Sequence, residues 1–133
     1  MFKSLMGGLT LVAVVGLFAQ GAQAERYVQL DAEVLSEILF GVRLSGELAR
    51  TGIAWRECIT PEGDTVYEFE GELSRGKLTI TDRNQACFDY GETTSCFDVY
   101  RAGARLLLSG QDEFTVTRIE TGVESCPLTK AIS

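Results

Sequence analysis

The sequence predicts a mainly β domain with one N-terminal helix, built as a small antiparallel meander or barrel of about seven strands and held by disulfides. Three observations support this prediction. Short runs of alternating apolar and polar residues follow Gly41, with turn sequences about every eight to twelve residues. One amphipathic segment precedes these runs. All four cysteines lie after an N-terminal segment that is typical of an export signal.

Residues 1–24 predict a cleavable secretory signal. A short start with one lysine leads into the apolar stretch 5–19, and Ala22 and Ala24 form an Ala-x-Ala cleavage site. A transmembrane anchor is the alternative, but the apolar part has about 15 residues where a bilayer span needs roughly 20. We therefore expect a periplasmic or secreted protein in which residues 25–133 form a single β-rich domain.

Charge and composition disfavour several classes of function. The only charge in the signal is Lys3, so the mature chain carries 11 basic and 19 acidic residues, a net charge of −8. An acidic surface repels nucleic acids and anionic membranes, so we expect no nucleic-acid partner and no stable membrane insertion after cleavage. The chain has no His, which excludes Ser-His-Asp and Cys-His catalysis and His-ligated metals. We expect no enzyme activity, no cofactor and no metal.

The four cysteines predict two disulfides, for which three connectivities are possible. The segment from Cys87 to Cys96 has the pattern of a β-hairpin with its turn at Gly91–Glu92, which places the two cysteines opposite each other within bridging distance. By elimination, Cys58 pairs with Cys126. A redox-active or metal-binding set is disfavoured, because there is no Cys-x-x-Cys pair and no His co-ligand.

A short helix is predicted near residues 31–40. Asp31 is a suitable N-cap, and Gly41 is a suitable C-terminal stop. The apolar residues of one face are Val34, Leu35, Ile38 and Leu39. A helix of under three turns is not stable alone, so we expect this face to pack on the sheet. A detachable arm that binds a partner is the alternative.

The predicted strands follow the helix in chain order. They cover residues 53–59, 67–73, 77–81, 87–90, 96–99, 105–108 and 114–119. The turns between them are expected at residues 60–64, 74–76, 82–84, 91–92, 102–103 and 109–112.

The candidate functional residues are few. Glu68, Glu70 and Glu72 form an acidic stripe along one predicted strand, which is a candidate surface for a basic partner or Ca²⁺. Such a stripe is more often the solvated face of a half-buried strand. Asp89 and Asp98 are a candidate acid pair, but exposed carboxylates without a pocket do little catalysis. The single Trp, Trp55, is expected to anchor the core, with a ligand-stacking platform as the alternative.

Several short segments resemble a loose group of small, mostly uncharacterised bacterial periplasmic proteins. The matching segments are Ile38-Leu39-Phe40-Gly41, Gly52-Ile53-Ala54-Trp55, Pro61-Glu62-Gly63, Cys87-Phe88-Asp89-Tyr90-Gly91 and Cys96-Phe97-Asp98-Val99. The resemblance implies a secreted β-domain with a leading helix and no catalytic residues. The chain differs from the group at Cys58, where an aromatic residue is common. Its general build is also similar to periplasmic inhibitors of lysozyme or of proteases.

These observations favour a non-enzymatic periplasmic or secreted domain that binds a protein partner or associates with the cell envelope. The net charge of −8 supports an alternative, an inhibitor of a cationic hydrolase such as lysozyme. A small enzyme that uses carboxylates alone is less favoured. A carrier of an apolar ligand is also less favoured, because a domain of this size with a helix leaves few strands to enclose a cavity.

The export signal gives the first testable prediction. Protein recovered from the periplasm should have an intact mass that corresponds to a chain beginning at Glu25, because the signal is removed after Ala24. A full-length species bound to the membrane would contradict this prediction.

Overall fold

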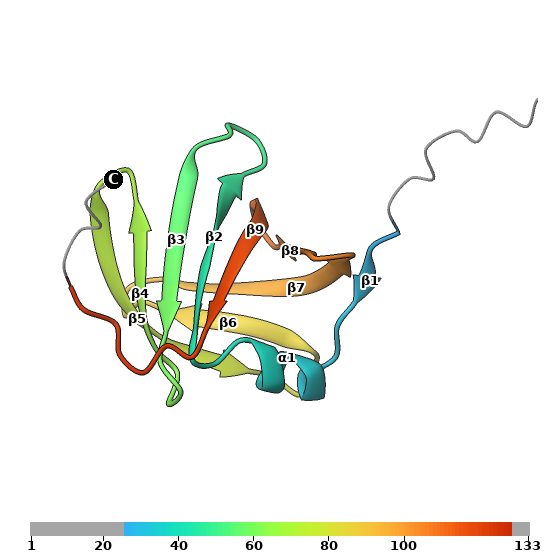
Figure 1. Ribbon diagram of the computed structural model, residues 1–133, viewed down its shortest axis with the longest axis horizontal. Helices are drawn as coiled ribbons and strands as arrows, with labels where there is room; N and C mark the ends of the chain where they lie inside the picture. The colour runs from blue at the N-terminus through green and yellow to red at the C-terminus, as the bar shows by residue number, and fades with distance from the viewer. Residues whose placement is uncertain (1–25, 129–133) are drawn as a thin grey trace, which may run out of the picture.

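Eight antiparallel strands close into a barrel in the computed structural model, which describes residues 26–128 (Figure 1). Consecutive strands from β2 to β9 pair with one another, and β9 pairs back with β2. The short β1 adds to β7 as an extra strand. The elements are β1 (Val28–Gln29), α1 (Ala32–Ile38), β2 (Val42–Leu48), β3 (Ala54–Ile59), β4 (Asp64–Phe69), β5 (Glu72–Ile80), β6 (Gln85–Asp89), β7 (Thr94–Ala102), β8 (Arg105–Ser109) and β9 (Glu113–Thr121). The predicted signal lies outside the described residues.

The predicted fold class is confirmed, with two corrections to the strands. The first concerns the turn expected at residues 74–76, which lie in the middle of β5. The chain reverses instead at Glu70 and Gly71, whose φ angles of 51° and 79° are those of a tight two-residue hairpin. Gly76 has a packing role, because a Cβ there would lie 2.6 Å from Cδ1 of Tyr90. The predicted strand 67–73 is therefore two strands.

The second correction is β2, which was not among the predicted strands. Its side chains alternate regularly, with Val42, Leu44 and Leu48 buried in the barrel. Gly46 interrupts the apolar series, and glycine weakens a strand prediction. In the barrel this glycine lies where β2 meets β9 at a register shift, and a Cβ would collide with the backbone oxygen of Thr115. Close contact between the two strands that close the barrel therefore requires it.

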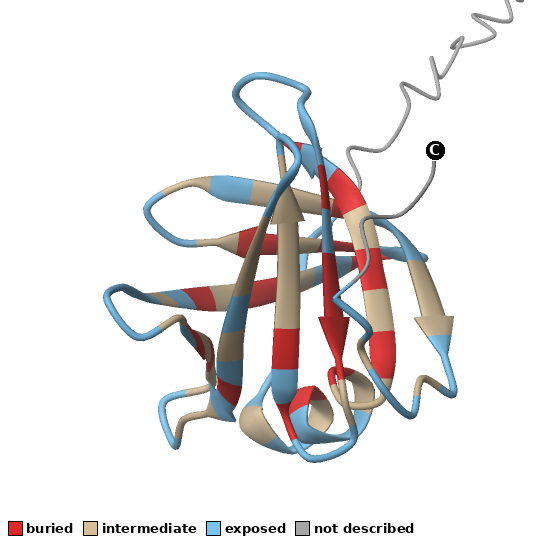
Figure 2. Ribbon diagram, turned by 90° about the vertical axis from the view of Figure 1, so that its left-hand side faces the viewer, coloured by how far each residue is buried: buried red, intermediate tan, exposed pale blue. Residues whose placement is uncertain are grey.

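Helix α1 covers one end of the barrel, the lower end in Figures 1 and 2. The side chains of Leu35 and Leu39 are 0% exposed and belong to the core. The Asp31 carboxylate accepts a hydrogen bond of 3.0 Å from the Val34 backbone N–H, as predicted for an N-cap. The side chain of Asn84, in the β5–β6 turn, accepts a second bond of 2.8 Å from the Ala32 N–H. The helix is thus packed on the barrel, as predicted, and is not a free arm.

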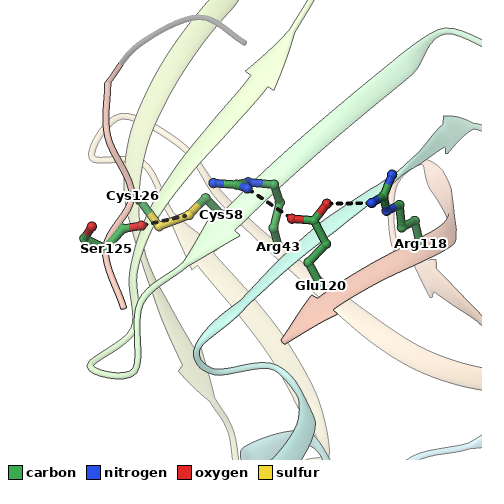
Figure 3. Close-up of polar contacts among 6 residues, drawn as sticks. All are labelled: Arg43, Cys58, Arg118, Glu120, Ser125 and Cys126. Carbon is green, nitrogen blue, oxygen red and sulfur yellow. Dashed lines mark hydrogen bonds and ion pairs between the residues drawn. A yellow bond between two sulfur atoms is a disulfide. The ribbon is translucent and has the colours of Figure 1, made fainter. Parts of the chain in front are cut away.

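Both predicted disulfides are confirmed. Cys87 and Cys96 lie directly opposite each other on β6 and β7, with 4.0 Å between their Cα atoms. Cys58 on β3 is joined to Cys126 in the C-terminal segment, with 5.7 Å between their Cα atoms (Figure 3). This second bond closes a loop with a sequence separation of 68 residues, which stabilises the fold by about 4 kcal/mol in the chain-entropy account. Two structural disulfides are consistent with an oxidising compartment.

The packing of α1 generates a stability prediction. Leu39→Ala removes buried methyl groups and leaves a cavity, so the free energy of unfolding should fall by about 2–5 kcal/mol. For a domain of this size the melting temperature should fall by about 10 °C or more. Leu128→Ala is the matched control, because this leucine is 45% exposed. Thermal unfolding followed by circular dichroism measures both, and equal melting temperatures for the two variants would contradict the packing of the helix.

Candidate binding cavity

A cavity of about 210 Å³ lies inside the barrel, toward the end opposite α1. Inward-facing side chains of β3, β4, β6, β7, β8 and β9 form its walls, and the β8–β9 loop contributes Gln111 and Asp112 at its rim. Strand alternation directs every second side chain inward, and an eight-stranded barrel is just wide enough to hold one small ligand. The expectation that too few strands remain to enclose a cavity is therefore wrong.

Aromatic rings form a continuous series around the cavity. Successive ring contacts join Tyr67, Tyr90, Phe88, Phe97, Phe114 and Trp55. The centroids of neighbouring rings are 5.5–6.4 Å apart, within the range of favourable aromatic pairs. Five of these rings come from five different strands and Tyr90 directly follows β6, so the cavity wall also holds the barrel together. Trp55 is buried in the core, as expected, and it also lines the cavity, where its ring is placed to contact a ligand.

A carboxyl group, Glu57, is buried beside these rings. Its side chain follows Trp55 by two positions on β3, faces the interior, and is 2% exposed. The Tyr90 hydroxyl donates a hydrogen bond of 2.8 Å to Glu57 Oε1. Glu57 Oε2 and the indole Nε1 of Trp55 are both buried without a hydrogen-bond partner. Unpaired buried polar atoms cost about 1–3 kcal/mol each, so two of them beside one cavity need an explanation.

Burial raises the pKa of Glu57 from its ordinary value of 4.5 to about 8. The hydrogen bond from Tyr90 lowers this pKa in part. The nearby Thr65 hydroxyl also lowers this pKa, although its geometry falls short of a regular hydrogen bond. Burial and the charge of Glu57 raise the pKa of Tyr67 to about 12 and raise that of Tyr90 well above its usual range. At neutral pH, Glu57 is therefore largely protonated, and both tyrosines are neutral.

The predicted acidic stripe is not a single strand face. Glu68 lies on β4 with its side chain outside the barrel, Glu70 occupies the turn, and Glu72 begins β5 opposite Phe69. The three side chains share the β4–β5 hairpin, but the turn separates their directions. Binding of a basic partner such as a cationic hydrolase stays a prediction.

The candidate acid pair is not brought together. The register places Asp89 opposite Thr94 and Asp98 opposite Gln85, at different ends of the β6–β7 pairing. Asp89 accepts a hydrogen bond from the Gly91 N–H, and Asp98 accepts one from the Gln85 side chain. The expectation that the two carboxylates are close in this hairpin is wrong, because the hairpin that pairs Cys87 with Cys96 separates them.

The outer face of the barrel carries a second hollow, of about 530 Å³, that is polar. Glu120 on β9 forms ion pairs of 3.1 Å with Arg43 and with Arg118 (Figure 3). Arg56 on β3 also lines this hollow. The ion-paired side chains are 36–72% exposed, so solvent screens their charges. Trp55, whose Nε1 is unpaired, lines both hollows, whereas Glu57, with its unpaired Oε2, lines the interior cavity alone. We therefore favour the interior cavity as the candidate site.

Comparison with protein-family models, with curated proteins and with solved structures gives no match. Among residues 26–128, no group of three or more His, Cys, Asp or Glu side chains is arranged to hold a metal ion. The helix in this part of the chain is too short to span a membrane.

Glu57 is the residue of the site that sequence reasoning missed. The signal is present, since Trp55, Glu57 and Ile59 alternate on one strand and two of the three are large and apolar. A charged residue in phase with core residues is unusual, and almost always has a paired or functional role. Arg56, its neighbour, has the opposite phase and faces outward.

The buried carboxyl group predicts how stability depends on pH. The folded protein holds this proton up to about pH 8, whereas the unfolded chain releases it near 4.5. The folded state therefore binds more protons between these values, so its stability falls as the pH rises from about 4.5 to 8, by on the order of a few kcal/mol.

Glu57→Gln should remove this part of the pH dependence and raise the melting temperature most at pH 8. Glu68→Gln, which changes an outward carboxyl group on the neighbouring strand, is the matched control. Melting temperatures of the three proteins between pH 4 and 9 test the prediction. Parallel curves for the wild type and Glu57→Gln would contradict it.

Proposed function

We propose that this protein is a non-enzymatic binding protein that holds one small, mainly aromatic or apolar molecule inside its barrel. The observation that carries the proposal is the pair of unpartnered polar atoms, Glu57 Oε2 and Trp55 Nε1, in the wall of an aromatic cavity. Binding sites for small molecules commonly combine apolar walls with a few placed polar groups. A bound molecule with a polar group would satisfy the atoms that the protein leaves unpaired.

The dimensions of the cavity support a ligand of about one ring. Apolar cavities of about 150 Å³ accept benzene, so 210 Å³ accommodates a ring with a small polar substituent. The ring series also favours binding without large rearrangement, because strand pairing fixes each aromatic residue. The helix and the core fill the opposite end of the barrel, which leaves the loop end for a ligand to enter.

The proposed location is the periplasm or the cell exterior. Two disulfides are consistent with an oxidising compartment, and the predicted signal at residues 1–24 favours export. In that location the protein would capture or carry a small molecule. A partner protein that receives the molecule fits the expectation of a periplasmic binding domain.

A second candidate function is proton-transfer catalysis, which the raised pKa of Glu57 favours. Such catalysis needs a second group with a suitable pKa near the first. Of the described residues that line the cavity, Tyr90 is held neutral at physiological pH, and Asp112 is 44% exposed and paired with Arg50. This arrangement favours binding over catalysis. A binding protein releases its bound probe chemically unchanged, whereas an enzyme converts it.

The proposal predicts saturable binding of a small one-ring alcohol. Benzyl alcohol should change the emission of Trp55, the only tryptophan, because the indole lines the cavity. Ser95→Phe should abolish this response, since Ser95 lines the cavity and a ring there fills it. Thr79→Phe places the same ring on the exposed face of β5 and is the matched control. An equal response from the wild type and Ser95→Phe would place binding elsewhere and contradict the proposal.

A further inference from the structure

The charged residues that line the cavity are all acidic. Glu57 lies deep in its wall and Asp112 at its rim, and no Lys or Arg lines it. At the mouth, Arg50 pairs with Asp112, with 3.6 Å between Arg50 Nη2 and Asp112 Oδ1. That pair is exposed to solvent, so its charges are largely screened. Glu57 has no basic partner among the described residues, so the cavity lacks a counter-charge.

The aromatic rings around Glu57 also favour positive charge. Tyr67 and Tyr90 have ring centroids 5.9 Å apart, and Tyr90 holds Glu57 by a hydrogen bond of 2.8 Å. The faces of aromatic rings attract cations, and this attraction grows when water is excluded. A buried carboxyl group, aromatic faces and the absence of a basic residue in the lining are the features of a site for an organic ammonium ion.

We infer that the ligand of the proposed binding function is a small organic cation, an ammonium group on a ring-sized apolar body. The ammonium group lies against the Glu57 carboxylate and the faces of Tyr67 and Tyr90. The apolar body packs on Phe88, Phe97 and Phe114. If the apolar body carries a hydrogen-bond acceptor, the Trp55 N–H donates to it. This inference rests on the proposed function and specifies the chemistry of the molecule bound.

Cation binding is coupled to the ionisation of Glu57. In the empty cavity this carboxyl group keeps its proton up to about pH 8, so a cation that pairs with the carboxylate releases that proton to solvent. The other titratable groups that face it, Tyr67 and Tyr90, stay neutral through this range. Asp112 lies at the rim of the cavity, paired with Arg50. The affinity for a permanent cation should therefore rise about tenfold per pH unit below pH 8 and level off above it.

The test compares two probes of nearly the same shape. Benzyltrimethylammonium carries a permanent charge, and neopentylbenzene is its neutral counterpart with carbon in place of nitrogen. Binding is measured through Trp55 emission between pH 6 and 9, and proton release is measured by calorimetry in two buffers of different ionisation enthalpy. We expect the cation to bind at least about tenfold more tightly than the neutral probe at pH 9. At pH 7 its binding should release close to one proton, and at pH 9 almost none.

Glu57→Gln should weaken binding of the cation at pH 9 by about tenfold or more and abolish the proton release, because the carboxylate is removed while the rings remain. Glu68→Gln, the control on the outer face, should behave as the wild type. Equal or tighter binding of the neutral probe by the wild type would overturn the cation inference and leave the proposed function standing. If neither probe binds the folded wild type, both the inference and the proposed function are overturned.

Discussion

The pairing of β2 with β9 is the constraint on which the rest of the structure depends. It turns a meander of antiparallel hairpins into a closed barrel, and a closed barrel has an interior that the open meander lacks. The approach of the two strands at Gly46 and the register shift beside it allow this closure. Once the sheet is closed, the inward side chains of six strands face one another across a common space. The core at the helix end and the cavity at the loop end both follow.

The two ends of the barrel differ in what fills them. Leu35 and Leu39 of α1 complete a packed apolar core at one end, and Asp31 and Asn84 fix the helix there through its first turn. At the other end, large rings leave a space that no side chain fills, and a carboxyl group is buried in its wall. Burying Glu57 lowers stability at neutral pH, because the group would ionise more readily in water. Tyr90 pairs with one oxygen of Glu57 and the other oxygen is left unpaired, so a group that costs stability in this way is consistent with the proposed binding function.

Local signals in the sequence were sufficient for much of the fold. The N-cap Asp31, the apolar helix face and the hairpin register that opposes Cys87 to Cys96 each depend on neighbouring residues, and each is confirmed. The turn at Glu70–Gly71 was missed because Gly76 gave the stronger turn signal. Gly76 is instead required by its contact with the ring of Tyr90, which is distant in the sequence. Closure of the barrel is likewise a pairing of distant strands, β2 with β9, and periodicity within a strand carries no information about it.

The candidate site was less accessible from sequence than the fold. Glu57 lies in phase with Trp55 and Ile59, but its importance depends on Tyr90 and on the closed sheet that buries it. The acidic residues that the sequence makes conspicuous, Glu68, Glu70 and Glu72, instead diverge around a hairpin turn. Charge along a strand is visible in a sequence, whereas burial of a single charge is a property of the assembled barrel.

Glu57 is a buried carboxyl group in the cavity that we propose binds a ligand. The most direct test is an NMR titration of its side-chain carboxyl carbon, with Glu57→Gln used to assign the signal. We expect a pKa near 8 for Glu57 in the empty protein and a large fall when the cavity holds an organic cation. A pKa near 4.5 that does not respond to cations would show a solvated carboxylate and contradict the account.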